Sequence, residues 1–300
     1  MGSVPAYATP PTFLGIAAHD PHASAVIAGV PFDIGTTNRS GARFGPHAIR
    51  HASRMLTDGA HPTAWVDPAA RKISDAGDFE TALGDIGKTL ALIEAQAAPF
   101  AHLITLGGEH TISLPLLRAL AKKSVTAPAL VHFDAHVDTW PDSYGQAYGH
   151  GQPFWHAIRE GLIDPARTVQ IGIRSPVQRE VWDWTLAQGV TIIPAHEVHE
   201  AGPAATAARI SDIVGAAPAY LSFDIDCLDP AFAPGTGTPE IGGLASWQAQ
   251  SILRRLGDID WLGMDLVEMA PAYDVAEITA LAGATIVYEY LALLAAQSKI

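Results

Sequence analysis

The sequence predicts an α/β protein with a parallel sheet that is covered by helices on both faces. Short apolar runs alternate with longer helical patterns along almost the whole chain. The apolar runs are continuous, which is typical of strands buried on both faces of a parallel sheet. Metal-binding types of residue directly follow several runs, and such sheets bind ligands at the carboxyl ends of their strands. The pattern leaves open whether the sheet closes into a barrel.

Eight segments qualify as strands, and the segments between them are long enough for crossover helices. The strand candidates are residues 26–30, 73–76, 103–106, 130–133, 169–173, 190–193, 220–223 and 259–266. The clearest helical patterns are residues 86–97, 114–122, 178–188, 204–214 and 247–256. Because no linker, repeat or low-complexity segment divides the chain, we expect a single domain over residues 1–300, with an irregular N-terminal arm at residues 1–24.

The composition limits the partners and the compartment. Apolar residues form 48% of the 300 positions, which suits a large buried core, and the formal net charge is −13. That charge argues against nucleic acid or an anionic membrane as a partner, and it is compatible with a cationic small molecule. The single cysteine, Cys227, excludes an intramolecular disulfide and fits the reducing cytosol, so we expect a cytoplasmic protein.

We expect neither a signal peptide nor a membrane span. The first 24 residues contain four prolines and lack the basic start and apolar core of a signal peptide. Residues 278–296 are apolar enough to resemble a span, but Glu289 interrupts them, and a charge at mid-membrane is costly. We therefore interpret this segment as a buried helix.

Three metal-binding types of residue follow the fourth strand at every second position. Asp134, His136 and Asp138 point the same way if the chain is extended, because side chains alternate along a strand. Two carboxylates packed this closely raise each other's pKa and destabilise the site unless a cation compensates them. A capping or salt-bridge cluster is the alternative, but the spacing favours a metal site.

Two further strands end in residues of the same kinds. Asp224 and Asp226 follow the seventh strand, and the third strand leads through a Gly-Gly pair, which permits close backbone packing, to His110. Six ligands at three strand ends are enough to hold two metal ions. The set is rich in oxygen and therefore suits Mn²⁺ better than structural Zn²⁺, with Ni²⁺, Co²⁺ and Fe²⁺ as alternatives.

Other polar residues near the predicted strand ends have two interpretations each. His150 lies in a glycine-containing loop, where it is either a proton shuttle or an exposed loop histidine. Glu268 follows the eighth strand and either reaches the same site or has a helix-capping or surface role. The glycine-rich segment 235–243 lacks the order of a phosphate-binding loop, so we interpret it as a shaped loop. Cys227 is interpreted as a packing residue.

Taken together, these motifs resemble those of the ureohydrolase family, which includes arginases and agmatinases. The matching segments are Gly-Gly-Glu-His at 107–110, Phe-Asp-Ala-His-Val-Asp at 133–138, Ser-Phe-Asp-Ile-Asp-Cys-Leu-Asp-Pro at 222–230, and residues 29–33, 41–46 and 233–239. The resemblance implies an arginase-like three-layer α/β/α sandwich with an open, eight-stranded, mostly parallel sheet. It also implies a binuclear manganese centre, hydrolysis of a guanidino compound to urea and an amine, and a homotrimer or homohexamer.

The resemblance also implies a role for each motif residue. One Mn²⁺ would be held by His110, Asp134, Asp138 and Asp224, and the other by Asp134, His136, Asp224 and Asp226. His150 matches the proton-shuttling histidine of the family, and Glu268 matches the acidic residue that binds the guanidinium group. Asp226 would relay a proton during catalysis.

The loops favour agmatine as the substrate, which would give putrescine and urea. Residues 172–178 lack the acid expected to bind the α-ammonium group of arginine, and residues 139–144 differ from the carboxylate-binding loop of arginases. One position departs from agmatinases, because Gln152 stands where they typically carry threonine. We therefore regard Gln152 and the nearby Trp140 as substrate-binding candidates, and no role is assigned to Trp155 and His156.

Other functions remain open at this point. A guanidino acid such as 4-guanidinobutanoate would need a cationic partner, with Arg43 or Arg174 as candidates, and guanidine itself is another option. An arginase is less favoured. A dinuclear phosphoesterase would need basic residues to hold phosphate, and none lies within the ligand motifs. A non-catalytic homologue would be expected to have lost ligands, whereas all six are present.

Overall fold

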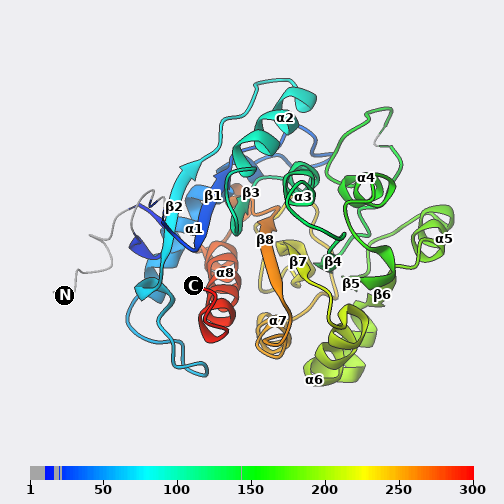
Figure 1. Ribbon diagram of the computed structural model, residues 1–300. Coiled ribbons are helices and arrows are strands. Elements are labelled where there is room, and N and C mark those ends of the chain that lie inside the picture. The colour runs from blue at the N-terminus through cyan, green and yellow to red at the C-terminus, as the bar shows by residue number, and fades with distance from the viewer. Residues whose placement is uncertain (1–10, 17–19, 21, 143) are drawn as a thin grey trace.

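The computed structural model describes residues 11–16, 20, 22–142 and 144–300. Its centre is one open sheet with helices packed on both faces, which Figure 1 shows with the sheet seen nearly edge-on. The expected N-terminal arm falls partly on residues 1–10, 17–19 and 21, which lie outside the described residues. The described part packs on the core, because Phe13 is fully buried and its N–H donates to Asp75 Oδ2 at 2.8 Å.

All eight predicted strands are present. They are β1 (Ala25–Val30), β2 (Ile73–Asp78), β3 (Leu103–Gly107), β4 (Ala129–Phe133), β5 (Thr168–Ile173), β6 (Thr191–Pro194), β7 (Ala219–Asp224) and β8 (Trp261–Val267). Every pair is parallel, and the order is β2-β1-β3-β8-β7-β4-β5-β6. The sheet is therefore open, with β2 and β6 at its edges. Every residue of β4, β5 and β7 is buried, which explains why apolar residues predominate in all three strands.

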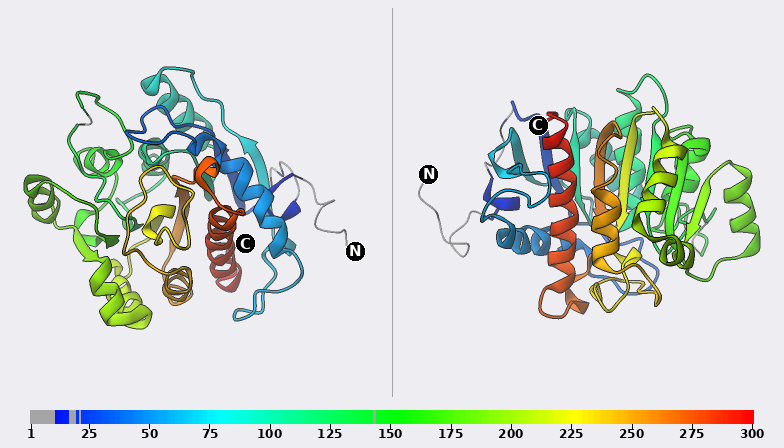
Figure 2. Two further views of the ribbon diagram at one scale, coloured as in Figure 1. Left: turned by 180° about the vertical axis from the view of Figure 1, so that it is seen from behind. Right: turned by 90° about the horizontal axis from the view of Figure 1, so that it is seen from below.

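The helices form two layers, one on each face of the sheet (Figure 2). They are α1 (Gly45–Ser53), α2 (Ile86–Ala97), α3 (Ser113–Ala121), α4 (Pro153–Arg159), α5 (Arg179–Ala187), α6 (Ala195–Val214), α7 (Ser246–Leu253) and α8 (Ile278–Ala296). The largest apolar cluster lies between the sheet and α1, α6, α7 and α8, while α2 and α3 pack on the other face. The sequence predicted α2, α3, α5, α7 and the second half of α6, but not α1 or α4.

The apolar segment 278–296 forms the core helix α8, as expected. By length and composition it passes the test for a membrane span, but 78% of its most apolar window is buried inside the protein. Glu289, which interrupts it, is itself buried and pairs with Arg254 and His61. The interpretation as a buried helix is therefore confirmed.

The strand order brings distant parts of the chain together. Strands β8 and β7 lie between β3 and β4, so four neighbouring strands come from residues 103–107, 261–267, 219–224 and 129–133. Because all of them are parallel, their carboxyl ends meet at one edge of the sheet. This is the edge at which parallel α/β sheets bind ligands.

Candidate metal centre and active site

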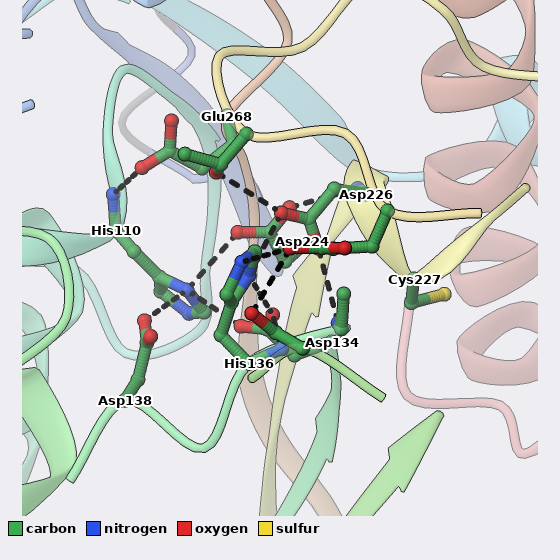
Figure 3. Close-up of polar contacts among 12 residues, drawn as sticks. His110, Asp134, His136, Asp138, Asp224, Asp226, Cys227 and Glu268 are labelled. Carbon is green, nitrogen blue, oxygen red and sulfur yellow. Dashed lines mark hydrogen bonds and ion pairs between the residues drawn. The ribbon is translucent and has the colours of Figure 1, made fainter. Parts of the chain in front are cut away.

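The predicted metal-binding residues and Glu268 converge at the carboxyl ends of the four central strands (Figure 3). His110 follows β3, Asp134 follows β4, Asp224 is the last residue of β7, and Glu268 follows β8. The Gly-Gly pair before His110 permits this approach, because a Cβ at Gly108 would lie 2.6 Å from the carbonyl oxygen of Val30. The side chains of all four polar residues are almost completely buried.

Three carboxylates surround one nitrogen of His110. Its Nδ1 lies 2.9 Å from Asp138 Oδ2, 3.1 Å from Asp134 Oδ2 and 3.3 Å from Asp224 Oδ2. Burial lowers the pKa of His110, but the carboxylates of Asp134 and Asp138 outweigh burial and raise that pKa well above its ordinary value. The position therefore attracts a positive charge.

The other nitrogen of His110 belongs to a buried hydrogen-bond chain. Nε2 lies 2.8 Å from Ser222 Oγ, and Ser222 donates its own proton to Asp265 Oδ1 at 2.6 Å. Ser222 can then only accept from His110, so we infer that Nε2 carries the proton. Among the residues that the structure describes, Nδ1 has no hydrogen-bond partner, so in the neutral form of the ring, the form that binds metals, its lone pair faces the carboxylates. A metal-binding histidine is commonly oriented in this way by the partner of its second nitrogen.

A second group of ligand atoms lies beside the first. His136 Nδ1 is 3.2 Å from Asp134 Oδ1 and 3.1 Å from Asp226 Oδ2. Ligand atoms of these three residues all lie within 4.8 Å of one another. Asp134 thus directs Oδ2 toward His110 and Oδ1 toward His136, so its carboxylate lies between the two groups. That placement suits a ligand shared by two cations.

The electrostatics of the cluster fit divalent cations. Burial raises the pKa of Asp224 well above its ordinary value, and the neighbouring Asp226 and Asp134 carboxylates raise it further. Burial also raises the pKa of Asp226, with Asp134 adding to the effect against the opposing influence of His136. Carboxylates held this close are stable in the ionised state only when positive charge compensates them. These carboxylates and histidines are therefore suitable ligands for a binuclear metal site.

His132 was missed as a member of the site. Its Nε2 lies 2.7 Å from Asp134 Oδ2, and its Nδ1 lies 3.2 Å from Gln170 Nε2. Ligand atoms of His132, His110 and Asp134 also lie within 4.8 Å of one another. The sequence contained the signal, because His132 precedes Asp134 by two residues and so continues the same spacing. It was read instead as part of the apolar strand β4.

Glu268 and His150 lie together beside the metal-binding residues. Glu268 Oε1 accepts the backbone N–H of His110 at 2.9 Å and lies 3.1 Å from His150 Nδ1. Glu268 Oε2 is buried and has no hydrogen-bond partner among the residues that the structure describes. The backbones of Glu268 and Asp138 have positive φ angles of 65° and 48°, which are costly for residues other than glycine. Strain of this kind is often found where side chains are fixed for function.

His150 is held from both sides. Thr37 Oγ1 lies 2.7 Å from its Nε2, opposite the contact between Nδ1 and Glu268. Burial lowers the pKa of His150, but Glu268 and then Glu109 and Asp138 raise it to about 9. The alternative of an exposed loop histidine is wrong, because His150 is only 9% exposed. Thr37 was not predicted from the sequence, and nothing in its local pattern indicates this contact.

Two other candidates, Trp140 and Gln152, form hydrogen bonds with residues outside the metal-binding cluster. The indole N–H of Trp140 donates to Gln178 Oε1 at 2.6 Å, and its ring covers Gly151. Gln152 is buried and donates to the carbonyl of Gln146 at 3.2 Å. A substrate-binding role for Trp140 and Gln152 stays a prediction. Cys227 is fully buried, and Figure 3 shows its sulfur pointing away from the metal-binding residues.

The parallel sheet and the buried carboxylate and imidazole groups at its strand ends define a metal-dependent α/β enzyme. The chain belongs to the arginase family, whose family model matches residues 23–292. It is 46% identical to an agmatinase from Neisseria meningitidis serogroup C over 279 residues, which cover 91% of this chain and 88% of that protein. Membership of this family implies a binuclear metal site and an enzyme of the ureohydrolase type.

Solved structures agree with this assignment. A hypothetical agmatinase from Burkholderia thailandensis superimposes with a TM-score of 0.91 at 44% identity, covering 98% of this chain and 93% of its own. Proclavaminate amidino hydrolase from Streptomyces clavuligerus superimposes with a TM-score of 0.92 at 40% identity, covering 98% and 99%. The expected arginase-like sandwich is therefore confirmed.

Proposed function

We propose that the protein hydrolyses agmatine to putrescine and urea. One observation carries this function: the buried metal-binding cluster lies beside a carboxylate, Glu268, whose Oε2 has no hydrogen-bond partner in the described part of the chain. An unpartnered buried carboxylate oxygen beside a hydrolytic site suits a planar guanidinium cation. Relatives named agmatinase that are 45–48% identical over more than nine-tenths of this chain support the choice of substrate.

The proposed cofactor is a pair of Mn²⁺ ions in each subunit. His110, Asp134, Asp138 and Asp224 would hold one ion, and Asp134, His136, Asp224 and Asp226 the other. The oxygen-rich donor set supports Mn²⁺ over Zn²⁺, with Ni²⁺ or Co²⁺ as alternatives that metal substitution tests. When bound, the pair of cations lowers the pKa of water and so supplies a nucleophile near neutral pH.

The side chains of the site perform the remaining steps. Glu268 binds the guanidinium group and orients its plane, and its contact with the His110 N–H fixes the carboxylate. Against the effect of burial, Glu268 and Glu109 raise the pKa of His150 to about 9, so its imidazole can take up a proton and pass it to the leaving amine. Asp226 accepts the proton that the attacking water loses. The enclosure of these groups excludes bulk water, which strengthens each interaction.

The two basic residues that would recognise a guanidino acid are already engaged. Arg43 pairs with Asp33, whose carboxylate accepts its Nε–H at 2.5 Å. Arg174 donates to the backbone carbonyls of Asp226 and Glu240 at 2.8 and 2.6 Å. Both guanidinium groups are thus already held by partners of their own, and this favours agmatine over 4-guanidinobutanoate and arginine.

Further expectations about assembly, compartment and partners belong to this proposal. The enzyme is a homotrimer or homohexamer in the cytoplasm, and residues 1–300 form a single catalytic domain. Its net charge of −13 suits a cationic substrate rather than nucleic acid or an anionic membrane. Trp140 and Gln152 contribute to the substrate side of the site.

The test is urea release from agmatine, arginine, 4-guanidinobutanoate and guanidine, each with added Mn²⁺ and after chelation. Agmatine with Mn²⁺ should give the highest kcat/KM, with putrescine formed in equal amount, and chelation should abolish the reaction. A phosphate monoester serves as the control for a dinuclear phosphoesterase. A higher kcat/KM with arginine or a guanidino acid, or hydrolysis of the phosphate ester alone, would contradict the proposal.

A further inference from the structure

One acidic residue at the opening of the site has no part in the proposed mechanism. Glu240 lies in the segment 235–243, which passes over the metal-binding cluster. A Cβ at Gly237 would lie 3.8 Å from Glu268 Oε2, and Thr238 Oγ1 lies 3.4 Å from Asp226 Oδ2. Glu240 follows Thr238 by two residues. The segment therefore runs from beside Glu268, the proposed guanidinium-binding carboxylate, to the outer edge of the site.

The carboxylate of Glu240 lies close to the site but remains accessible to solvent. Its Oε1 is 3.9 Å from His136 Nε2, which is too long for a direct hydrogen bond, and its side chain is 32% exposed. The side chain of His136 is itself 16% exposed. Solvent and substrate can therefore reach the edge formed by these two residues, unlike the fully buried carboxylates below it.

The surrounding contacts fix the direction of this carboxylate. Ser175 Oγ donates to Glu240 Oε1 at 3.0 Å, and Arg174 donates from Nη2 and Nε to the backbone carbonyl of Glu240 at 2.6 and 3.2 Å. Two residues further on, the N–H groups of Gly242 and Gly243 donate to Asp229 Oδ2 at 2.7 and 3.1 Å. A carboxylate held in this way loses little freedom when it binds a cation.

The charge of Glu240 is not neutralised by a lysine or arginine. Across the residues that the structure describes, its one ion pair within 4.0 Å is the long contact with His136. The nearby guanidinium group of Arg174 donates to backbone carbonyls. The opening of the site thus carries a fixed, partly exposed negative charge with capacity to accept hydrogen bonds.

We propose that Glu240 binds the terminal ammonium group of the substrate, so that the enzyme recognises both ends of a guanidino amine. This inference rests on the proposed function. An extended four-methylene arm places the ammonium about 7 Å from the guanidinium carbon, and the three Cα–Cα steps from Gly237 to Glu240 span at most roughly 10 Å. Glu268 at the inner end and Glu240 at the outer end therefore suit the two charges of one diamine-like substrate.

A comparison of two substrates tests this role. Agmatine and 1-butylguanidine share the guanidinium group and the arm, but butylguanidine lacks the ammonium. Glu240→Gln should lower kcat/KM for agmatine by roughly 10- to 100-fold, the usual range for a hydrogen bond to a charged group. The same variant should change kcat/KM for butylguanidine by no more than about 2-fold, because this substrate has no group for Glu240 to bind.

Two control variants separate recognition from a general charge effect. Asp258→Asn removes an exposed carboxylate in the segment that leads into β8, at the opposite edge of the sheet. This variant should have the same kcat/KM as the wild-type protein for both agmatine and butylguanidine. Glu240→Asp keeps the charge on a shorter side chain and should restore part of the preference for agmatine. The metal content of every variant is measured, and we expect it to match that of the wild-type protein.

Two results would overturn the inference. If Glu240→Gln lowers kcat/KM equally for both substrates or loses metal, Glu240 acts through His136 instead of binding the substrate. If agmatine hydrolysis is unchanged, Glu240 has no part in recognition. Failure of the proposed function gives a different result, because the wild-type protein itself would then prefer another guanidine to agmatine, and both proposals would be rejected.

Discussion

Two clusters in which a buried carboxylate meets a histidine differ in how their charges are balanced. In the first, Glu289 of α8 accepts from His61 Nε2 at 2.9 Å, from Arg254 at 2.9 and 2.5 Å, and from Gln250 at 3.3 Å. Both oxygens of Glu289 are thus occupied, and a guanidinium group balances its charge. This cluster is complete without any further partner.

The cluster at the strand ends is balanced differently. The carboxylates of Asp134, Asp224 and Asp226 face one another, and burial and this proximity raise the pKa of Asp224 and Asp226. His110 Nδ1 has no hydrogen-bond partner among them. Buried polar groups are normally paired, so a cluster that the chain does not satisfy indicates a place for an external cation. The contrast distinguishes a structural cluster from a functional one.

The largest expected effect is at the carboxylate that lies between the two metal-binding groups. Asp134→Ala should abolish urea release, because it removes a ligand from both groups at once. Metal analysis of the purified variant should show loss of bound Mn²⁺, whereas Glu289→Gln should retain it. An Asp134→Ala protein that kept two ions per subunit would remove the distinction between the clusters.

The next largest expected effect is a loss of kcat at His150, with the bound metal retained. His150→Asn should lower kcat by roughly 10²- to 10⁴-fold, the usual scale for general acid catalysis. Metal content should stay unchanged, since His150 contacts Glu268 and Thr37 rather than the metal-binding side chains. Steady-state kinetics together with metal analysis checks this. A variant with normal kcat would show that another group protonates the leaving amine.

The structural cluster should give the opposite pattern. Glu289→Gln should lower the free energy of unfolding by about 2–3 kcal/mol, because it leaves the partly buried Arg254 without its anion. Values of kcat and KM for agmatine should be unchanged. Denaturant unfolding and kinetics measured on the same sample check both parts. A large loss of activity in a folded variant would mean that the two clusters are coupled.

The smallest expected effect is a gain in stability, at Asp224. Burial raises the pKa of Asp224, and the Asp226 and Asp134 carboxylates raise it further. In protein without metal, ionised Asp224 therefore destabilises the folded state, and this destabilisation increases as the pH rises above the ordinary carboxyl pKa. Asp224→Asn should therefore stabilise chelated protein by about 1 kcal/mol near pH 8, and by less as the pH falls toward about 4. Thermal unfolding at several pH values measures this. Destabilisation throughout that range would contradict the charge imbalance.

Much of the fold was predictable because its strands are buried on both faces. Continuous apolar runs gave all eight strands, and the placement of ligands after strands gave the cluster of His110, Asp134 and Asp224. Helices α1 and α4 were missed because they are short and begin next to Pro46 and Pro153. Proline at the start of a helix is favourable, but in a glycine-rich context it reads equally well as a loop.

The parts that were missed depend on long-range partners. His61 lies 228 positions before Glu289 in the sequence, so no local pattern could show that this apparent interruption of an apolar helix is neutralised. The engagement of Arg174 by backbone carbonyls is likewise visible only in the folded chain. His132 is different, because its spacing from Asp134 was available in the sequence.

The insertion of β7 and β8 between β3 and β4 has a consequence for synthesis on the ribosome. A nascent chain that ends before residue 219 lacks β7 and β8, which lie between β3 and β4 in the finished sheet, and it also lacks Asp224, Asp226 and Glu268. On the proposed function, the full set of metal ligands therefore comes together only after these two strands have been synthesised.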